Sequence, residues 1–481
     1  MSVKKGAIII TISILLSRFL SLFFIFPFSR IVGKDGLALY SISYVPFVFF
    51  LDLTTLGIPL ALAKETSKYL ANNKNPYGLI KGSLLMVSIL SVISILVINL
   101  MSKKYLNIIL PNQNIEDECL GIRIISISLL FTPLTFLLRG IFQGYKKLKI
   151  IAISQVFEQI IRVSLILFGC YIVMKYNKDY KLAVYIALIA TSVSSLFTSL
   201  ALFVFYKRLR LQKCKGIIIK KILFSSIPFL ILGISLNLYQ LIDSIFYVRG
   251  LLKIGIENAK YYYGIYSFEI NKLIMIPVSI SIGYATSILP NLATRNDNMI
   301  SKALYQLFMI VFPIFLYTYI KGDRIYSIFF NSNDGGAMLK GYSVMIILLS
   351  FNQITSSIMQ GINKGKALSM GIIISIILKF LLTYPFILIF NIYGSLASSF
   401  ISLMFIIIYN FYHLRNELDM RYINEMLVSL IFSVIAIFVL RININNNLLD
   451  FIITSIIYFL TYFIFQGVHY FNNKLSNKGI Y

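Results

Sequence analysis

Four polar side chains share one face of a strongly apolar segment. Gln155, Glu158, Gln159 and Arg162 follow the spacing i, i+3, i+4, i+7, which places them on one side of a helix. The surrounding run, residues 150–174, is long and apolar enough to cross a bilayer. A carboxylate or a guanidinium at that depth costs roughly 2.5–3.5 kcal/mol on insertion scales. The spacing therefore predicts a face that lines a path for a polar substrate, although Glu158 and Arg162, one turn apart, can also neutralise each other.

Other ionisable residues are also expected at membrane depth. The cations are Arg18, Arg123, Arg162, Lys272 and Lys379, and the acids are Asp52, Glu158, Asp243 and Glu269. Arg123 lies near the start of its apolar run and is interpreted as interfacial. With Arg123 counted, the cations outnumber the acids by five to four. A cavity with a positive surplus favours an anionic substrate such as a phosphate or pyrophosphate group.

Each buried charge needs a partner or a functional role. Asp52 can pair with Arg18, contact the substrate, or do both. Lys379 has no acidic neighbour in its own predicted helix, so its partner is expected from another span. Asp243 is the candidate for that partner.

Composition and patterning both indicate a polytopic membrane protein. Of the 481 residues, 58% are hydrophobic and 13% are charged, whereas a soluble protein carries about 25% charged residues. Fourteen apolar runs are long enough to span a bilayer, and they lie near 7–28, 37–62, 80–101, 120–140, 150–174, 182–206, 222–247, 262–289, 300–320, 338–361, 367–390, 392–412, 424–440 and 448–467. The first run is interpreted as a retained span, because it is too long for a cleaved signal peptide and contains an arginine.

The net charge of +26 is distributed as in a membrane protein. With fourteen spans and a cytoplasmic N-terminus, Lys and Arg are enriched in the cytoplasmic connections, which is the positive-inside pattern. The densest basic cluster, within residues 207–221, is interpreted as a topology anchor rather than a nucleic-acid site. Both termini are then cytoplasmic. The three cysteines and two histidines have no metal-ligand spacing, and the sequence predicts neither a metal nor a cofactor.

A weak internal repeat suggests how the spans are organised. Gln143-Gly144, Lys147, Lys149 and Arg162 match Gln360-Gly361, Lys364, Lys366 and Lys379 at one constant offset. A six-span unit repeats in the same orientation, as in a parallel transporter repeat. We therefore expect an all-α polytopic membrane protein of about fourteen transmembrane helices. Its parts are a six-helix lobe (1–206), a basic cytoplasmic linker (207–221), a second six-helix lobe (222–414), and two further helices with a cytoplasmic tail (415–481). The two lobes form a pseudo-twofold repeat around a central cavity.

The segment RGIFQGYKKLKIIAISQVFEQIIRV (139–163) resembles the signature of the stage V sporulation protein B and polysaccharide-export branch of the MOP flippase superfamily. Residues 53–71, 238–252, 263–293 and 359–369 agree with that resemblance, which covers nearly the whole chain. The branch is related to the lipid II flippases and to the Wzx-type oligosaccharide flippases. The resemblance implies two lobes in a V that alternate between inward-open and outward-open states.

The resemblance also implies roles for individual residues. In lipid II flippases an arginine cluster binds the pyrophosphate; Arg18 matches one member, and Lys272 falls near another as a lysine. Two further members are replaced, with Phe24 and Leu51 in the matching regions. Some lipid II flippases hold a sodium ion in the second lobe, where this chain has the expected Asp243–Lys379 pair. The basic RGIFQGYKKLK stretch is interpreted as a conformational feature at the cytoplasmic end.

The sequence thus predicts a transporter that flips an undecaprenyl-pyrophosphate-linked sugar or muropeptide by alternating access, for cell-wall, spore-cortex or polysaccharide synthesis. No enzymatic step is expected. The partners are the lipid-linked anionic substrate, membrane lipid and cell-envelope synthesis proteins, and the chain is expected to be a monomer. A MATE-like drug or organic-cation antiporter is the alternative transporter, and it predicts dominant cavity acids. A membrane glycosyltransferase predicts a large external loop or an acidic metal motif, neither of which is present. A non-transporting envelope scaffold is a third alternative.

Overall fold

The computed structural model describes residues 16, 20–21, 24–209, 218–292, 299–362, 364–441 and 444–476. Throughout these ranges all regular secondary structure is helical, which confirms the all-α prediction. The helices fall into two compact units. The first combines the chain up to Glu269 with Gly365–Ser402, and the second combines Ile270–Lys364 with Leu403–Tyr481.

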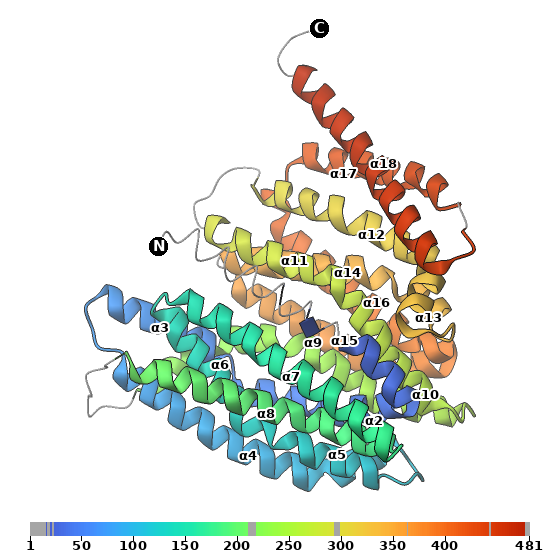
Figure 1. The fold of residues 1–481 in the computed structure, drawn as a ribbon. Coiled ribbons are helices and arrows are strands. Elements are labelled where there is room, and N and C mark those ends of the chain that lie inside the picture. The colour runs from blue at the N-terminus through green and yellow to red at the C-terminus, as the bar shows by residue number, and fades with distance from the viewer. Residues whose placement is uncertain are drawn as a thin grey trace. The chain divides into compact units, whose positions relative to one another are not determined.

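The first unit contains the helices that carry most of the predicted site. They are α2 (Ile25–Thr55), α3 (Ile58–Ala71), α4 (Tyr77–Ile109), α5 (Glu116–Ser126), α6 (Ser128–Gly144), α7 (Leu148–Tyr176), α8 (Tyr180–Lys207), α9 (Lys220–Lys253), α10 (Ala259–Gly264), the π-helical turn η1 (Ile265–Ile270), α15 (Gly365–Phe390), the 3₁₀ turn η2 (Asn391–Tyr393) and the first part of α16 (Gly394–Leu414). Within this unit α8 packs against both α6 and α7, and α9 packs against α15 (Figure 1).

The second unit contains the remaining helices. They are α11 (Asn271–Leu292), α12 (Met299–Phe330), α13 (Gly336–Tyr342), α14 (Val344–Gly361), the end of α16, η3 (Arg415–Glu417), α17 (Met420–Ala436), η4 (Ile437–Arg441) and α18 (Asn447–Ser476). A buried carboxylate ties α12 to the start of α18, because Asp450 lies 3.1 Å from Lys321 Nζ and 2.9 Å from Arg324 Nη1. The predicted division into two six-helix lobes stays a prediction.

A break between α2 and α3 falls where the sequence contains Gly57-Ile58-Pro59. Leu56 and Gly57 both adopt positive φ, at 46° and 68°, and end the first helix. Pro59 then stands in the first turn of α3, where a missing N–H costs nothing. The kink predicted from these three residues is present.

Two glycines of the RGIFQG stretch allow α6 to approach α3 closely. A Cβ atom added at Gly140 would lie 2.4 Å from the backbone oxygen of Pro59, and one at Gly144 would lie 2.6 Å from Thr66 Cβ. Only glycine fits such a crossing, so the motif sets the distance between these two helices.

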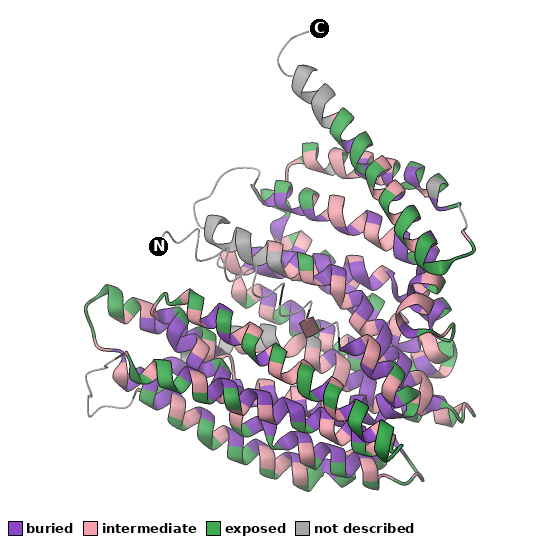
Figure 2. Ribbon diagram, in the orientation of Figure 1, coloured by how far each residue is buried: buried purple, intermediate pink, exposed green. Residues whose placement is uncertain are grey.

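The helices have the length and surface of membrane spans. Ten segments of the described ranges are long and apolar enough to cross a bilayer. One of them, Gly365–Glu417, contains two of the predicted runs joined by the turn η2. Large apolar side chains lie exposed along α4 and α18, among them Leu100, which is 82% exposed (Figure 2). An apolar exterior is what hydrocarbon requires, so this is a multi-pass membrane protein. The count of fourteen spans stays a prediction, and most of the first run, 7–28, lies outside the described residues.

Candidate functional site

A polar cavity of about 500 Å³ lies within the first unit. Its walls come from α2, α6, α7 and α8, together with Ser21. The lining residues are Ser21, Tyr44, Phe47, Leu51, Thr132, Phe136, Arg139, Gln155, Glu158, Gln159, Arg162 and Thr191. All four members of the face predicted from their spacing on α7 are among them. The helical period therefore identified the wall of a real cavity, and we refer to it as the α7 cavity.

The carboxylate of the α7 cavity is neutralised by an arginine from the neighbouring helix. Arg139 Nη2, on α6, lies 2.7 Å from Glu158 Oε2, and Arg139 Nε donates to Ser154 Oγ at 3.0 Å. Both ion-pair partners are nearly buried, with side chains 12% and 9% exposed. The possible pairing of Glu158 with Arg162 is therefore wrong. The i, i+4 spacing would allow that pair, but Arg139 on α6 already occupies the carboxylate, and Arg162 donates to Gln159 and Ser21 instead.

Arg162 keeps a positive charge that no acid among the described residues offsets. Its Nη2 donates to Gln159 Oε1 at 2.6 Å and to Ser21 Oγ at 3.4 Å, and both partners are neutral. Its Nε–H is buried and has no hydrogen-bond partner among the described residues. The α7 cavity contains two arginines and one glutamate, so it carries a surplus of one positive charge. A partly buried guanidinium at a cavity wall, with neutral hydrogen-bond partners, is suited to bind an anion.

The other predicted site residues have different surroundings. Asp52 Oδ2 accepts a hydrogen bond of 2.6 Å from Asn237 Nδ2 on α9. Arg18, its expected partner, lies outside the described residues. Lys272 lies on α11 in the second unit and is partly buried. The roles of these three residues in substrate binding stay predictions.

The ion pair expected between Asp243 and Lys379 is present. Lys379 Nζ, on α15, lies 2.6 Å from Asp243 Oδ1 on α9, and the lysine side chain is fully buried. Tyr266, in the π-helical turn η1, donates a hydrogen bond of 2.6 Å to Asp243 Oδ2. The serines on α16 that complete the surroundings of this lysine were not predicted from the sequence.

Arg139 is the cavity residue that sequence reasoning assigned to another role. It begins the RGIFQG stretch, which we interpreted as a conformational feature of the cytoplasmic end, yet its side chain lines the α7 cavity. The sequence did contain a signal for this pair. A buried glutamate requires a cation, and Arg139 lies close before Glu158 in the chain, where adjacent helices can bring the two side chains together.

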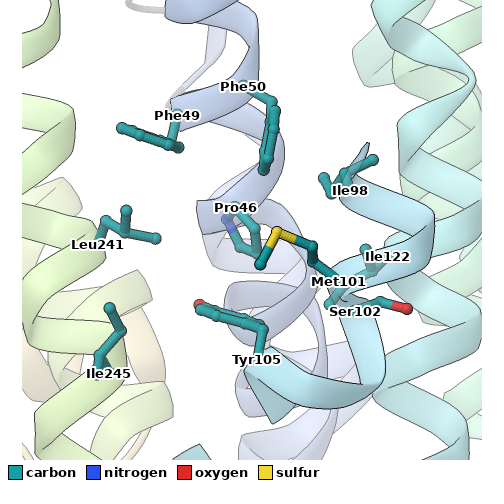
Figure 3. A pocket seen from close by; sticks show the side chains of 10 residues that line it. All are labelled: Pro46, Phe49, Phe50, Ile98, Met101, Ser102, Tyr105, Ile122, Leu241 and Ile245. Atoms are coloured by element: carbon teal, nitrogen blue, oxygen red, sulfur yellow. The ribbon is translucent and has the colours of Figure 1, made fainter. Parts of the chain in front are cut away.

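A second, smaller pocket of about 200 Å³ has an apolar lining (Figure 3). It lies between α2, α4, α5 and α9, and the residues around it are Pro46, Phe49, Phe50, Ile98, Met101, Ser102, Tyr105, Ile122, Leu241 and Ile245. Met101 is 50% exposed and stands at the edge of the outer surface of α4. This pocket offers hydrocarbon contacts rather than hydrogen bonds, so it does not compete with the α7 cavity for a polar group.

Comparison with known proteins identifies the family. The model of the polysaccharide biosynthesis protein family matches residues 3–296, which is more than half of the chain. The chain belongs to this family. It is 25% identical over 461 residues to the lipid II flippase MurJ of Bacillus subtilis (strain 168), covering 87% of this chain and 83% of that protein. It is 22% identical over 403 residues to the stage V sporulation protein B of the same organism, covering 78% and 76%. The resemblance found in the sequence is confirmed.

Solved structures share the fold. A lipid II flippase MurJ in an inward closed conformation superposes with a TM-score of 0.72 at 16% identity, covering 97% of this chain and 99% of that one. An inward-facing multidrug resistance MATE family transporter of the MOP superfamily gives a TM-score of 0.63 at 17% identity, covering 87% and 98%. The chain therefore shares its fold with a lipid II flippase and with a MATE family transporter.

Proposed function

We propose that the protein is a flippase that moves an undecaprenyl-pyrophosphate-linked sugar or muropeptide across the cytoplasmic membrane by alternating access. The family assignment and the similarity to a lipid II flippase and to the stage V sporulation protein B support this class of substrate. The apolar exterior lets a lipid tail remain in the bilayer while the head group enters a polar cavity.

The observation that carries the proposal is the uncompensated charge of Arg162 in the α7 cavity. Its side chain lines the cavity and its hydrogen-bond partners are neutral, which leaves its charge available to an anionic oxygen. The same observation weighs against the MATE-like alternative, because an organic cation needs a free carboxylate at the cavity wall. Glu158, the carboxylate of that wall, is already paired with Arg139. Arg18 and Lys272 are proposed as further contacts of the pyrophosphate.

Alternating access requires contacts that can open. Three contacts join helices of the predicted first lobe to the segment from α9 to η1, the start of the predicted second lobe. Lys34 Nζ lies 2.6 Å from Glu269 Oε2, and Lys260 Nζ lies 2.7 Å from Glu118 Oε1. The third is the hydrogen bond between the Tyr105 and Ser244 hydroxyls, at 2.8 Å.

In the proposed topology, with both termini cytoplasmic, these contacts lie toward the outer side. They close that side in the conformation described, and outward opening separates them. The ion pairs are reversible, because each can be broken without covalent change.

Two experiments together test the proposed function. The first is complementation of a bacterial strain depleted of its lipid II flippase, and the second is flipping of purified lipid II and of a pyrophosphate-linked oligosaccharide in proteoliposomes. We expect at least one of these lipids to be flipped, with growth restored if lipid II is the substrate. The matched control is efflux of organic cations from the same vesicles. Efflux without flipping of either lipid would establish the MATE-like function, and inactivity in both assays would favour the scaffold.

A further inference from the structure

The ammonium of Lys379 sits inside a cage of oxygen atoms in the first unit. Nζ lies 2.6 Å from Asp243 Oδ1 and donates to Ser399 Oγ at 2.7 Å and Ser398 Oγ at 3.0 Å. The Ser395 carbonyl oxygen at 3.2 Å and Ser395 Oγ at 3.4 Å complete the set. We call Asp243, Ser395, Ser398 and Ser399 the Lys379 cage. Its members come from α9 and α16, while the lysine reaches in from α15.

The cage offers more oxygens than a lysine can use. An ammonium has three N–H donors, whereas five oxygen atoms lie within 3.4 Å of Nζ. An arrangement built only to satisfy a buried lysine would need the carboxylate and two acceptors. A shell of five oxygens with one negative charge is instead the kind of environment that surrounds a small hard cation.

The hydroxyl protons of the cage point away from the lysine. Ser395 Oγ donates to the Tyr266 hydroxyl at 2.9 Å, and Ser398 Oγ donates to the Ser395 carbonyl at 3.0 Å. The Tyr266 hydroxyl in turn donates to Asp243 Oδ2 at 2.6 Å. The hydroxyl protons of Ser395 and Ser398 are thus engaged by other members of the network, and their lone pairs face the ammonium. This second layer holds the oxygens in place as acceptors of positive charge.

We propose that Lys379 is a built-in cation that takes the place of a soluble monovalent ion in this cage. The sodium ion that the resemblance implies for this region does not fit, because the ammonium fills the cage and already neutralises Asp243. The charge is attached to α15, so it cannot leave or enter during a transport cycle. The proposal goes beyond the flippase function, and it holds whichever substrate the protein moves. It also means that sodium binding at this site does not drive transport.

Ion binding to the purified full-length protein tests the proposal directly. The measurements are equilibrium binding of radiolabelled sodium, and the melting temperature in sodium chloride against choline chloride at equal ionic strength. We expect wild type to bind no sodium at the cage and to melt at the same temperature in both salts. Lys379→Ala empties the cage and leaves Asp243 uncompensated, so it is expected to melt several degrees lower in choline. Sodium should restore much of that loss, since a ligand that binds only the folded state stabilises it.

Two control variants separate cage chemistry from general damage. Lys379→Met removes the charge but fills most of the space, so we expect it to recover less in sodium than Lys379→Ala. Lys321→Ala breaks the other buried lysine pair, with Asp450 on the second unit, and should show no sodium-dependent recovery. Sodium bound by wild type and lost in Asp243→Asn would overturn the proposal. So would a folded Lys379→Ala protein that binds no sodium, because the cage would then not be suited to a cation. Neither result depends on transport. The flippase function and the role of Lys379 can therefore be refuted independently of each other.

Discussion

Arg162 offers the sharpest test of the α7 cavity. We predict that Arg162→Gln weakens binding of a polyprenyl pyrophosphate without unfolding the protein. Glutamine is shorter but keeps a polar amide that can donate a hydrogen bond, and it removes the positive charge that no acid of the cavity wall offsets. The protein should tolerate the change, because no buried carboxylate loses its partner.

The expected magnitude follows from the charge that Arg162 presents to the cavity. Its hydrogen-bond partners are neutral, so an anionic oxygen in the cavity gains a charge-assisted hydrogen bond to the guanidinium. Such a bond contributes about 1.5–3 kcal/mol. Since each 1.4 kcal/mol corresponds to about tenfold in affinity, the variant should bind roughly 10- to 150-fold more weakly. Arg162→Lys retains the charge and loses the fork of donors, so its loss should be smaller.

The assay is equilibrium binding of a fluorescent short-chain polyprenyl pyrophosphate to purified protein, followed by lipid flipping in proteoliposomes. A neutral polyprenol serves as the ligand control, and its binding should be unchanged. Arg123→Gln is the matched variant, because this arginine is exposed on α5 and was interpreted as interfacial. Pyrophosphate affinity within twofold of wild type in a folded Arg162→Gln protein would refute the assignment of this cavity as the anion site.

Three further predictions follow from the packing and charge of the first unit. Glu158→Gln should lower the melting temperature, because its arginine partner is left uncompensated, but pyrophosphate binding should not weaken in the same equilibrium assay. Gly140→Ala should cost about 1–3 kcal/mol through overpacking, measured by thermal unfolding in detergent, while Gly365→Ala, whose Cβ meets nothing within 4 Å, should not. Glu269→Gln should increase labelling of nearby engineered cysteines from outside the cell, because it breaks the ion pair with Lys34. A double variant that exchanges Lys34 and Glu269 should reverse that increase. Labelling of Glu269→Gln equal to that of wild type would exclude a gating role for the pair.

The sequence was sufficient to identify the face of α7 but not its partners. Spacing alone placed Gln155, Glu158, Gln159 and Arg162 on one side, because helical periodicity is a local property. The partner of Glu158 depends on how α6 packs against α7. That packing is set by contacts between the two helices, and the helical periodicity of one segment does not reveal it. Arg139 therefore entered the site only once the fold was known.

The pairing of Lys379 with Asp243 could be predicted by elimination. A lysine in the middle of a span must be neutralised, and few acids were available at the same depth. The serines of the Lys379 cage could not be found this way, because serine is common in apolar helices and carries no charge. Their number and orientation appear only when α9, α15 and α16 are brought together.

Lys379 and Arg162 differ in whether their charge is already compensated. This difference explains which of the two cations can bind a ligand. Lys379 is enclosed by a carboxylate and serine oxygens, so its charge is already compensated and is unavailable to a ligand. Arg162 lines a cavity wall, and its hydrogen-bond partners are neutral. Retaining a charge without a counter-charge in partly desolvated surroundings lowers stability. A ligand that supplies an anionic oxygen lowers that cost and removes the charge surplus. The cavity is therefore less stable empty than filled, which is the condition for binding a pyrophosphate group tightly enough to carry it through a conformational cycle.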